Sequence, residues 1–139
     1  MSVRQFVPAE PGKKRKRSSP DNNGLLFAAS LNGDVEVVKF VLAKEGVDVN
    51  RASENGSTPL FTASEHNYTE VVTLLLAAGA DVNRREHEYS RTPLYIASEK
   101  GHTEIAELLL AAPGIDVNQA DNDGRTPLCI ACEVGRTEV

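Results

Sequence analysis

The stretch RTPLYIASEKGHTEIAELLLAAPGIDVN, residues 91–118, encodes two short helices followed by a turn. Thr92 is placed to accept a backbone N–H at the start of the first helix, and Pro93 then occupies the first helical position, where a missing N–H costs nothing. Gly101 tolerates the left-handed conformation that ends such a helix. The second helix, TEIAELLLAA, is apolar over more than one stripe, so it needs neighbours on several sides.

The same pattern recurs along the chain. Thr-Pro-Leu occurs at 34-residue intervals, at 58–60, 92–94 and 126–128. The tripeptide Asp-Val-Asn ends at Asn50, Asn83 and Asn118. An earlier copy at 24–50 lacks Thr-Pro-Leu but matches from Ala29 onward. A fixed period of this size is typical of a solenoid, in which each unit packs only on its neighbours.

These motifs resemble the ankyrin repeat, whose units carry T-P-L-H-x-A. The resemblance covers 21–139, or about three and a half units. It implies an all-α ankyrin-repeat solenoid of stacked helix–turn–helix units, with β-hairpin-like fingers projecting from one side. The units are expected at 21–52, 53–85, 86–120 and 121–139, the last one truncated, after a disordered basic tail at 1–20.

The chain departs from the family's motif at the His position, which is occupied by Phe61, Tyr95 and Cys129. By resemblance, that His helps to tie a unit to its neighbour through hydrogen bonds. We therefore expect these bonds to be lost, with Phe61 and Tyr95 contributing packing instead. The finger RREHEYSRT of the third unit is one residue longer than the others and has no glycine, so its sequence does not specify how its tip turns.

The first unit is expected to behave as an N-terminal capping repeat. Because it lacks Thr-Pro-Leu, Asp21, Asn22 or Asn23 would cap its first helix. Its polar residues Asp34 and Lys39 suit an outward-facing surface.

The fourth unit stops at Val139, one turn into its second helix. We expect that helix to fray and Leu128 and Ile130 to remain only partly covered. This pattern favours a fragment or a truncated product, so an extended chain should be thermally more stable.

The composition fits a soluble protein with an aliphatic core, since apolar residues make up 40% of the chain and Trp is absent. No apolar run approaches the roughly 18 residues of a membrane helix, and the N-terminus has no apolar signal core. With two cysteines and no export signal, we expect an intracellular location, nucleus or cytoplasm, and no membrane partner.

Charge is distributed unevenly. Residues 1–20 contain six Lys or Arg and one Glu, a net +5, so the rest of this chain of net charge −5 carries −10. An acidic body is a poor phosphate-binding surface, and we do not expect nucleic acid to be its partner. The basic run consists of Lys13, Lys14, Arg15, Lys16 and Arg17. It resembles a monopartite nuclear import signal recognised by an import receptor; the alternatives are a solvated tail and weak nucleic-acid contact.

No residue set supports an enzyme, a metal site or a cofactor. Cys129 and Cys132 form C-x-x-C, but neither a thioredoxin-like context nor a second ligand pair accompanies them. They occupy repeat positions filled elsewhere by Phe, Tyr and Ser, which favours a structural role. Glu65, Glu99 and Glu133 are one repeat position copied three times, which makes a ladder and not a catalytic pair. We expect no small-molecule substrate.

By resemblance, a protein partner binds the finger tips and the exposed edge of the first helices. Those positions are Glu54, Asn55, Ser57, Glu65 and His66 in the second unit, Glu88, Tyr89, Arg91, Glu99 and Lys100 in the third, and Asn122, Asp123, Arg125 and Glu133 in the fourth. They are polar, variable among the copies and not needed for stacking. Tyr89 and Arg91 are the best anchor candidates, because aromatic and Arg residues dominate binding hot spots. The alternative is that these side chains only solvate the fingers.

The sequence therefore predicts a non-enzymatic protein-interaction module or scaffold whose partner it does not identify. One alternative is a fragment of a larger ankyrin-repeat protein whose missing part is an enzyme of kinase or ligase type. Another is a nuclear adaptor whose tail contacts nucleic acid.

Overall fold

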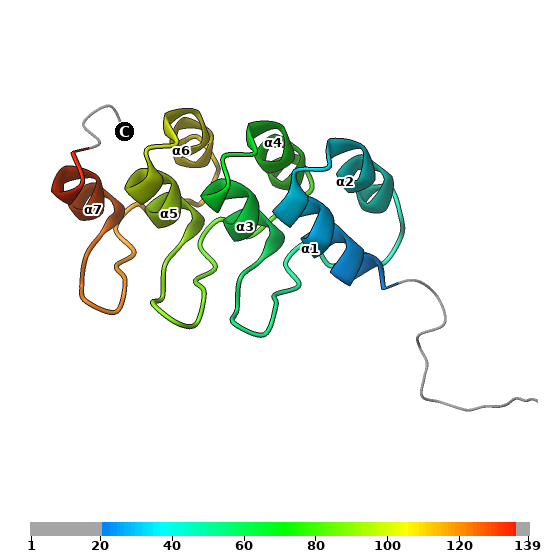
Figure 1. The fold of residues 1–139 in the computed structure, drawn as a ribbon, viewed down its shortest axis with the longest axis horizontal. Coiled ribbons are helices and arrows are strands. Elements are labelled where there is room, and N and C mark those ends of the chain that lie inside the picture. The colour runs from blue at the N-terminus through cyan, green and yellow to red at the C-terminus, as the bar shows by residue number, and fades with distance from the viewer. Residues whose placement is uncertain (1–20, 136–139) are drawn as a thin grey trace, which may run out of the picture.

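The computed structural model describes residues 21–135, which form seven α-helices and no strands (Figure 1). The helices are α1 (Asn22–Asn32), α2 (Val35–Leu42), α3 (Pro59–Glu65), α4 (Thr69–Ala77), α5 (Pro93–Lys100), α6 (Thr103–Leu110) and α7 (Pro127–Glu133). The predicted all-α solenoid is confirmed. The predicted tail at 1–20 and the second helix of the fourth unit lie outside the described residues.

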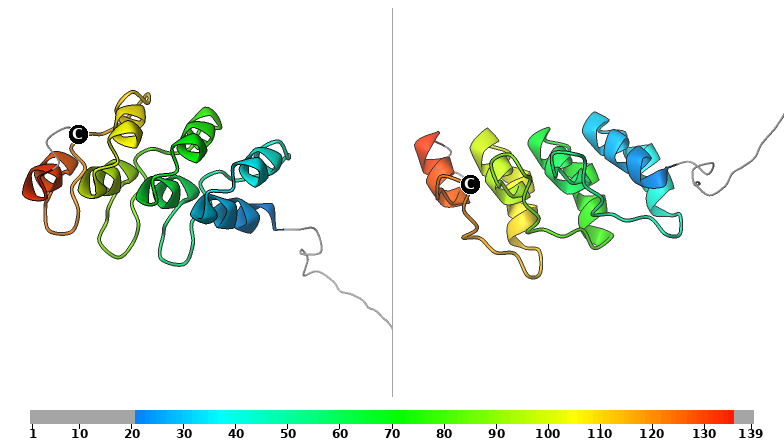
Figure 2. Two further views of the ribbon diagram at one scale, coloured as in Figure 1. Left: turned by 45° about the horizontal axis from the view of Figure 1, so that its top comes forward. Right: turned by 90° about the horizontal axis from the view of Figure 1, so that it is seen from below.

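The helices form two rows, and the loops form a third feature on one side. Helices α1, α3, α5 and α7 make the first row, and α2, α4 and α6 make a second row above it in the view of Figure 1 (Figures 1 and 2). The loops that lead into α3, α5 and α7 project together as the fingers (Figure 1). Each first helix packs on the next, α1 on α3, α3 on α5 and α5 on α7.

The recurring Thr-Pro pairs start three of the first helices as expected. The threonine hydroxyl accepts the backbone N–H three residues later, Thr58 from Phe61 at 3.2 Å, Thr92 from Tyr95 at 3.0 Å and Thr126 from Cys129 at 3.2 Å. A proline stands at the first helical position each time. Each hydroxyl satisfies one of the N–H groups that a helix start leaves unpaired.

The turn after each first helix uses one left-handed residue per unit. These residues are Gly33, Asn67, Gly101 and Gly135, with φ of 74°, 66°, 77° and 78°. They lie 34 residues apart, and the left-handed helix end predicted at Gly101 is confirmed.

The first helix α1 begins differently. Asp21 stands at its N-cap position, but the Asp21 side chain makes no capping hydrogen bond. The Asn23 side chain instead accepts the backbone N–H of Asp48 at 2.7 Å. Asn23 therefore ties α1 to the loop after α2.

The Asp-Val-Asn tripeptides join consecutive units. Within each tripeptide the Asp carboxylate accepts the Asn backbone N–H, at 3.0 to 3.1 Å. The Asn side chain then accepts an N–H from the next unit, Asn50 from Asp81 at 2.7 Å and Asn83 from Asp116 at 2.8 Å. These bonds repeat the contact that Asn23 makes to Asp48, so they fix the spacing between units.

Three repeated positions supply the core. They are Leu26, Leu60 and Leu94 in the first helices, and Val38, Val72 and Ala106, with Val41, Leu75 and Leu109, in the second helices. All are at most 3% exposed. Burying one such aliphatic side chain contributes roughly 1.5–3 kcal/mol relative to leaving it in water.

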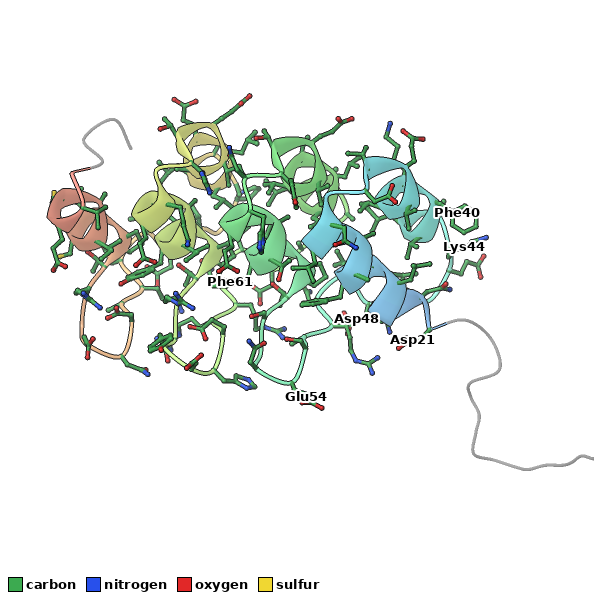
Figure 3. All side chains as sticks on the ribbon, viewed as in Figure 1. Asp21, Phe40, Lys44, Asp48, Glu54 and Phe61 are labelled. Carbon is green, nitrogen blue, oxygen red and sulfur yellow. The ribbon has the colours of Figure 1, made fainter. Side chains whose placement is uncertain are left out.

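One expectation about the ends of the stack needs correction. Ile130 is 3% exposed, so the expectation that it would be only partly covered is wrong: it lies among the buried residues of α7, which packs on α5. Leu128 is 68% exposed, as expected. In the first unit Asp34 and Lys39 are exposed, as expected, and Phe40 is also 58% exposed, with the Lys44 ammonium 4.1 Å from its ring centre (Figure 3).

Candidate functional site

The candidate site is the row of fingers and the edges of the first helices beside them. Each finger is closed at its base by one backbone hydrogen bond, Ser53 N–H to Ser57 O at 2.9 Å, Glu86 N–H to Arg91 O at 3.0 Å and Asp121 N–H to Arg125 O at 2.8 Å. We call these the second, third and fourth fingers after their units. Glu54 lies at the tip of the second finger (Figure 3).

The extra residue of the third finger lies between Glu86 and Arg91. Ser90 takes a left-handed φ of 61° at the place where the other two fingers have Gly56 and Gly124, with φ of 83° and 82°. The finger therefore turns in the same sense as the others without a glycine.

Glu86 holds this longer finger together. Its carboxylate is 3% exposed and accepts the backbone N–H groups of Glu88 at 2.8 Å, Tyr89 at 3.0 Å and Arg91 at 3.1 Å. The Arg91 Nε donates a further bond at 3.0 Å. Burial raises the pKa of Glu86, but the hydrogen bonds from Arg91, Tyr89 and Glu88 outweigh it, so the pKa lies below its ordinary value.

Asp121 has the same role in the fourth finger. Its carboxylate accepts the backbone N–H groups of Asp123 and Arg125, both at 2.9 Å, and the Arg125 Nε at 3.2 Å. The Tyr95 hydroxyl also donates to it, at 2.7 Å. Burial raises the pKa of Asp121, but the hydrogen bond from Tyr95 and the other donors bring it below its ordinary value.

The bond from Tyr95 corrects a prediction. Tyr95 lies in α5 of the third unit and Asp121 in the fourth, so the position that departs from the family's His still supplies a hydrogen bond between units. Burial and this bond raise the pKa of Tyr95 well above its ordinary value. Phe61 makes packing contacts as expected, since the Arg91 guanidinium lies 5.6 Å from its ring centre.

Neighbouring fingers are bonded to each other. The backbone N–H of His87 donates to Asn55 O at 2.8 Å, and that of Asn122 donates to Tyr89 O at 2.9 Å. The Asn122 side-chain amide also donates to Glu88 O at 2.9 Å. The three fingers therefore form one connected edge.

Arg91 lies at the centre of this edge. It pairs with the buried Glu86 and, at 3.8 Å, with Glu99, and its guanidinium stacks on the Tyr89 ring at 4.8 Å. Because Arg91 completes the environment of a buried carboxylate, it is a structural residue as well as a surface one.

The structure sorts the predicted partner-binding residues by exposure. Nine are exposed: Glu54, Asn55, His66, Glu88, Tyr89, Lys100, Asn122, Asp123 and Glu133. Four are half-buried: Glu65, Arg91, Glu99 and Arg125. Ser57 is 7% exposed, so it offers a partner much less surface than the other predicted residues.

Sequence reasoning missed Glu86 and Asp121, the two buried carboxylates that organise the fingers. The signal was present, since each acid stands four or five residues before the Arg of an Arg-Thr-Pro-Leu motif. An acidic residue at that spacing can reach both the arginine and the N–H groups between them.

The cysteines and histidines do not assemble a chemical site. Cys129 and Cys132 are free and exposed. Hydrogen bonding to Thr126 lowers the pKa of Cys129 below its ordinary value. His102 Nε2 lies 3.0 Å from Glu65 O, while His66 Nδ1 lies 2.9 Å from Thr62 O, so the two rings serve different local contacts. Within residues 21–135, no group of three or more His, Cys, Asp or Glu side chains could hold a metal ion.

The comparison with protein families agrees with this architecture. A model of ankyrin repeats, three copies, matches 2–86 and again 84–139. The chain belongs to the ankyrin repeat family. A search of curated proteins returned no match. Among the described residues, no helix has the length and apolar character needed to cross a membrane.

Proposed function

We propose that this chain is a non-enzymatic interaction module that binds a protein partner through its finger tips and the adjoining edge of the first helices. The observation that carries the proposal is Tyr89, which is 49% exposed on the third finger. Its backbone is fixed by Glu86 and Asn122, and its ring is stacked on Arg91. An exposed aromatic side chain on a fixed backbone loses little freedom on binding, which favours a binding anchor.

A hollow beside Tyr89 supports the same surface. It has a volume of about 290 Å³ between the third and fourth fingers. Its lining residues include Tyr89, Glu99 and Arg125. Such a mixture of aromatic and charged groups suits side chains of a protein partner. Ankyrin repeats generally bind proteins, and their domains are typically non-catalytic.

The proposal that the chain is not an enzyme rests on what its charged groups do. Glu86 and Asp121 are occupied by backbone N–H donors, and Arg91 and Arg125 are paired with them. A general base needs an accessible acceptor beside its substrate, and these buried carboxylates are fully used in holding the fingers.

The test compares partner recovery by the 139-residue chain and its Tyr89→Ala variant. Thr73→Ala, on the exposed side of α4, is the matched control. Arg91→Ala is unsuitable, because it would leave the buried Glu86 unpaired. We expect the proteins recovered by the wild type and by Thr73→Ala to be lost with Tyr89→Ala. Equal recovery by all three folded proteins would remove Tyr89 from the binding surface.

We also propose that the basic run Lys13–Arg17 directs nuclear import. Its support is five consecutive basic residues between Pro11-Gly12 and Ser18-Ser19-Pro20. Deleting residues 13–17 should shift a fluorescently tagged chain from the nucleus to the cytoplasm. If localisation and nucleic-acid affinity both survive the deletion, the run is only a solvated tail.

A further inference from the structure

Two of the interfaces between units share one arrangement of three side chains. An aromatic ring from one unit lies beside an arginine from the next finger, and that arginine pairs with a glutamate of its own unit. Phe61, Arg91 and Glu99 form the first set, with the guanidinium 5.6 Å from the ring centre and 3.8 Å from the carboxylate. Tyr95, Arg125 and Glu133 form the second, in which the Tyr95 hydroxyl and the Arg125 Nε donate to the same Asp121 oxygen and the guanidinium lies 3.3 Å from Glu133.

The interface between the first and second units has the ring and the carboxylate without the arginine. Counting back 34 residues from each set gives Phe27, Ser57 and Glu65. Phe27 is partly exposed, whereas Phe61 is 2% and Tyr95 1% exposed. Among residues 21–135, the Glu65 carboxylate takes part in no ion pair.

A groove occupies the place of the missing arginine. It has a volume of about 580 Å³, and its lining includes Phe27, Ser57 and Glu65. The corresponding hollow two units along contains Arg125 and has about 290 Å³. The lining residues Phe27, Leu31, Ser53, Glu54, Asn55 and Ser57 correspond in order to Tyr95, Glu99, Asp121, Asn122, Asp123 and Arg125.

We propose that this groove binds an arginine side chain of a partner protein. That side chain would supply the guanidinium that Arg91 and Arg125 supply in the next two interfaces, since the second finger has Ser57 instead. The guanidinium would stack on Phe27 and pair with Glu65, as Arg91 does with Phe61 and Glu99 in the next interface. This inference rests on the proposed function and names the partner chemistry at one end of the finger surface.

Charge and geometry favour arginine at this position. A planar guanidinium stacks on an aromatic ring and bonds a carboxylate at its edge, which a lysine ammonium does less well. Glu54, exposed at the finger tip on the rim of the groove, provides a second carboxylate for basic residues beside that arginine (Figure 3). The favoured partner segment is therefore basic and contains arginine.

The test is an NMR titration of the 139-residue chain with acetyl-Gly-Arg-Gly-amide. The control peptide replaces arginine by citrulline, which has nearly the same shape but no charge. We expect saturable chemical-shift changes at the amides of Phe27, Ser57 and Glu65 with the arginine peptide only. Equal changes with the citrulline peptide, or changes confined to other residues, would overturn the proposal.

Two variants check the site from opposite directions. Ser57→Arg should fill the groove from within and weaken peptide binding about tenfold or more, because the fourth finger, of the same length, already accommodates Arg125. If Ser57→Arg does not fold, Glu65→Gln removes the carboxylate instead, with Glu70→Gln in the exposed first turn of α4 as its control. Undiminished binding by a folded Ser57→Arg or Glu65→Gln variant contradicts the proposal.

The chain's own basic run is the competing occupant. It ends at Arg17, four residues before Asp21, and Asp21 borders a hollow that shares Phe27 and Glu54 with the groove. The titration is therefore repeated with Lys13–Arg17 replaced by Gln. Binding seen only in that variant would assign the groove to the chain's own arginines and overturn the partner contact. The peptide assay does not require Tyr89, so its failure is distinguishable from failure of the Tyr89→Ala experiment.

Discussion

A buried carboxylate lies at the base of two of the three fingers. Each carboxylate accepts hydrogen bonds from backbone N–H groups in place of water. Glu86 in the third finger receives three such donors and the Arg91 guanidinium. Asp121 in the fourth receives two, with Arg125 and the Tyr95 hydroxyl. The second finger has Ser53 at this position. The two fingers with a buried acid are thus the two that also carry an arginine, Arg91 or Arg125. In these fingers the same acid fixes the backbone and holds the arginine side chain.

Replacing Glu86 by Gln should destabilise the fold. It should also make the free energy of unfolding depend less steeply on pH in the acid range. The variant loses charge-assisted hydrogen bonds, and we expect the free energy of unfolding at pH 7 to fall by about 1.5–3 kcal/mol. The pKa of Glu86 is lower in the folded than in the unfolded chain, so its stabilisation is present above the ordinary value of 4.5 and is lost as pH falls through the folded value.

Urea unfolding between pH 7 and pH 3 measures both effects. The stability of the wild type should decline below pH 4.5, and that of Glu86→Gln should decline less steeply. Asp121 contributes in the same direction, so the slope is reduced and not abolished. Glu54→Gln, at an exposed finger tip, is the control and should follow the wild type. Parallel pH curves for wild type and Glu86→Gln would refute the role given to Glu86.

Removing the Tyr95 hydroxyl tests the bond between the third and fourth units. Tyr95→Phe keeps the buried ring but deprives the Asp121 carboxylate of a donor at 2.7 Å. We expect a loss of about 1.5–3 kcal/mol in urea unfolding, typical of a hydrogen bond to a charged group. Tyr68→Phe is the matched control, because the Tyr68 hydroxyl bonds no described residue. Equal effects of the two substitutions would mean that the Tyr95 bond adds nothing.

Some of these residues could be predicted from sequence and others could not. Thr58, Thr92 and Thr126 act within three residues of themselves, so their capping role follows from local spacing. Tyr95 and Asp121 are 26 residues apart and meet only because two units stack. The low exposure of Ser57 could not be predicted for the same reason, since burial depends on the folded chain as a whole.

The third finger is the least regular element of the described chain. Its sequence has no glycine, and Ser90 adopts the left-handed region at a cost that glycine would not pay. The four donors to Glu86 compensate for that cost by holding the loop closed. Helix starts and ends were predictable from capping residues, whereas this finger's shape depends on a buried acid that no turn rule identifies.

Substituting glycine for Ser90 should therefore stabilise the protein. The relief of left-handed strain exceeds the added freedom of glycine in the unfolded chain, and we expect a gain of about 0.5–1 kcal/mol in the free energy of unfolding. Thermal unfolding followed by circular dichroism measures it. Asn67→Gly, at φ of 66°, is the comparison and should gain less, because asparagine already tolerates this region. A loss of stability in Ser90→Gly would show that the serine side chain itself stabilises the finger.

At the scale of the molecule, the fold is a stack whose order was readable from the 34-residue period. The period identifies which residues are equivalent. It does not specify at which interfaces between units an arginine occupies the hollow. Phe27, Phe61 and Tyr95 are equivalent in sequence, yet the hollow lined by Phe27 has about 580 Å³ and the one lined by Tyr95 about 290 Å³, because Ser57 stands where the later fingers have arginine. The buried core could therefore be predicted by applying the pattern of one unit to the others. The groove could not, because it occurs where a single unit departs from that pattern.

Because contacts run only between neighbours, protection against amide exchange should be greatest in the middle of the stack. Helix α3 packs on α1 and α5, and α5 packs on α3 and α7, whereas α1 and α7 each pack on one first helix within residues 21–135. In a solenoid, stability is nearly a sum of such local terms, and the ends open most easily. We expect hydrogen–deuterium exchange to be slowest in α3 and α5.

Leu60→Ala in α3 tests this coupling between units. Leu60 is 1% exposed, so the substitution should lower the free energy of unfolding by about 2–5 kcal/mol and reduce protection in α1 and α5 as well. Leu128→Ala, at a residue that is 68% exposed, should leave stability and protection unchanged. Uniform protection from α1 to α7, or a Leu60→Ala effect confined to α3, would contradict a stack stabilised unit by unit.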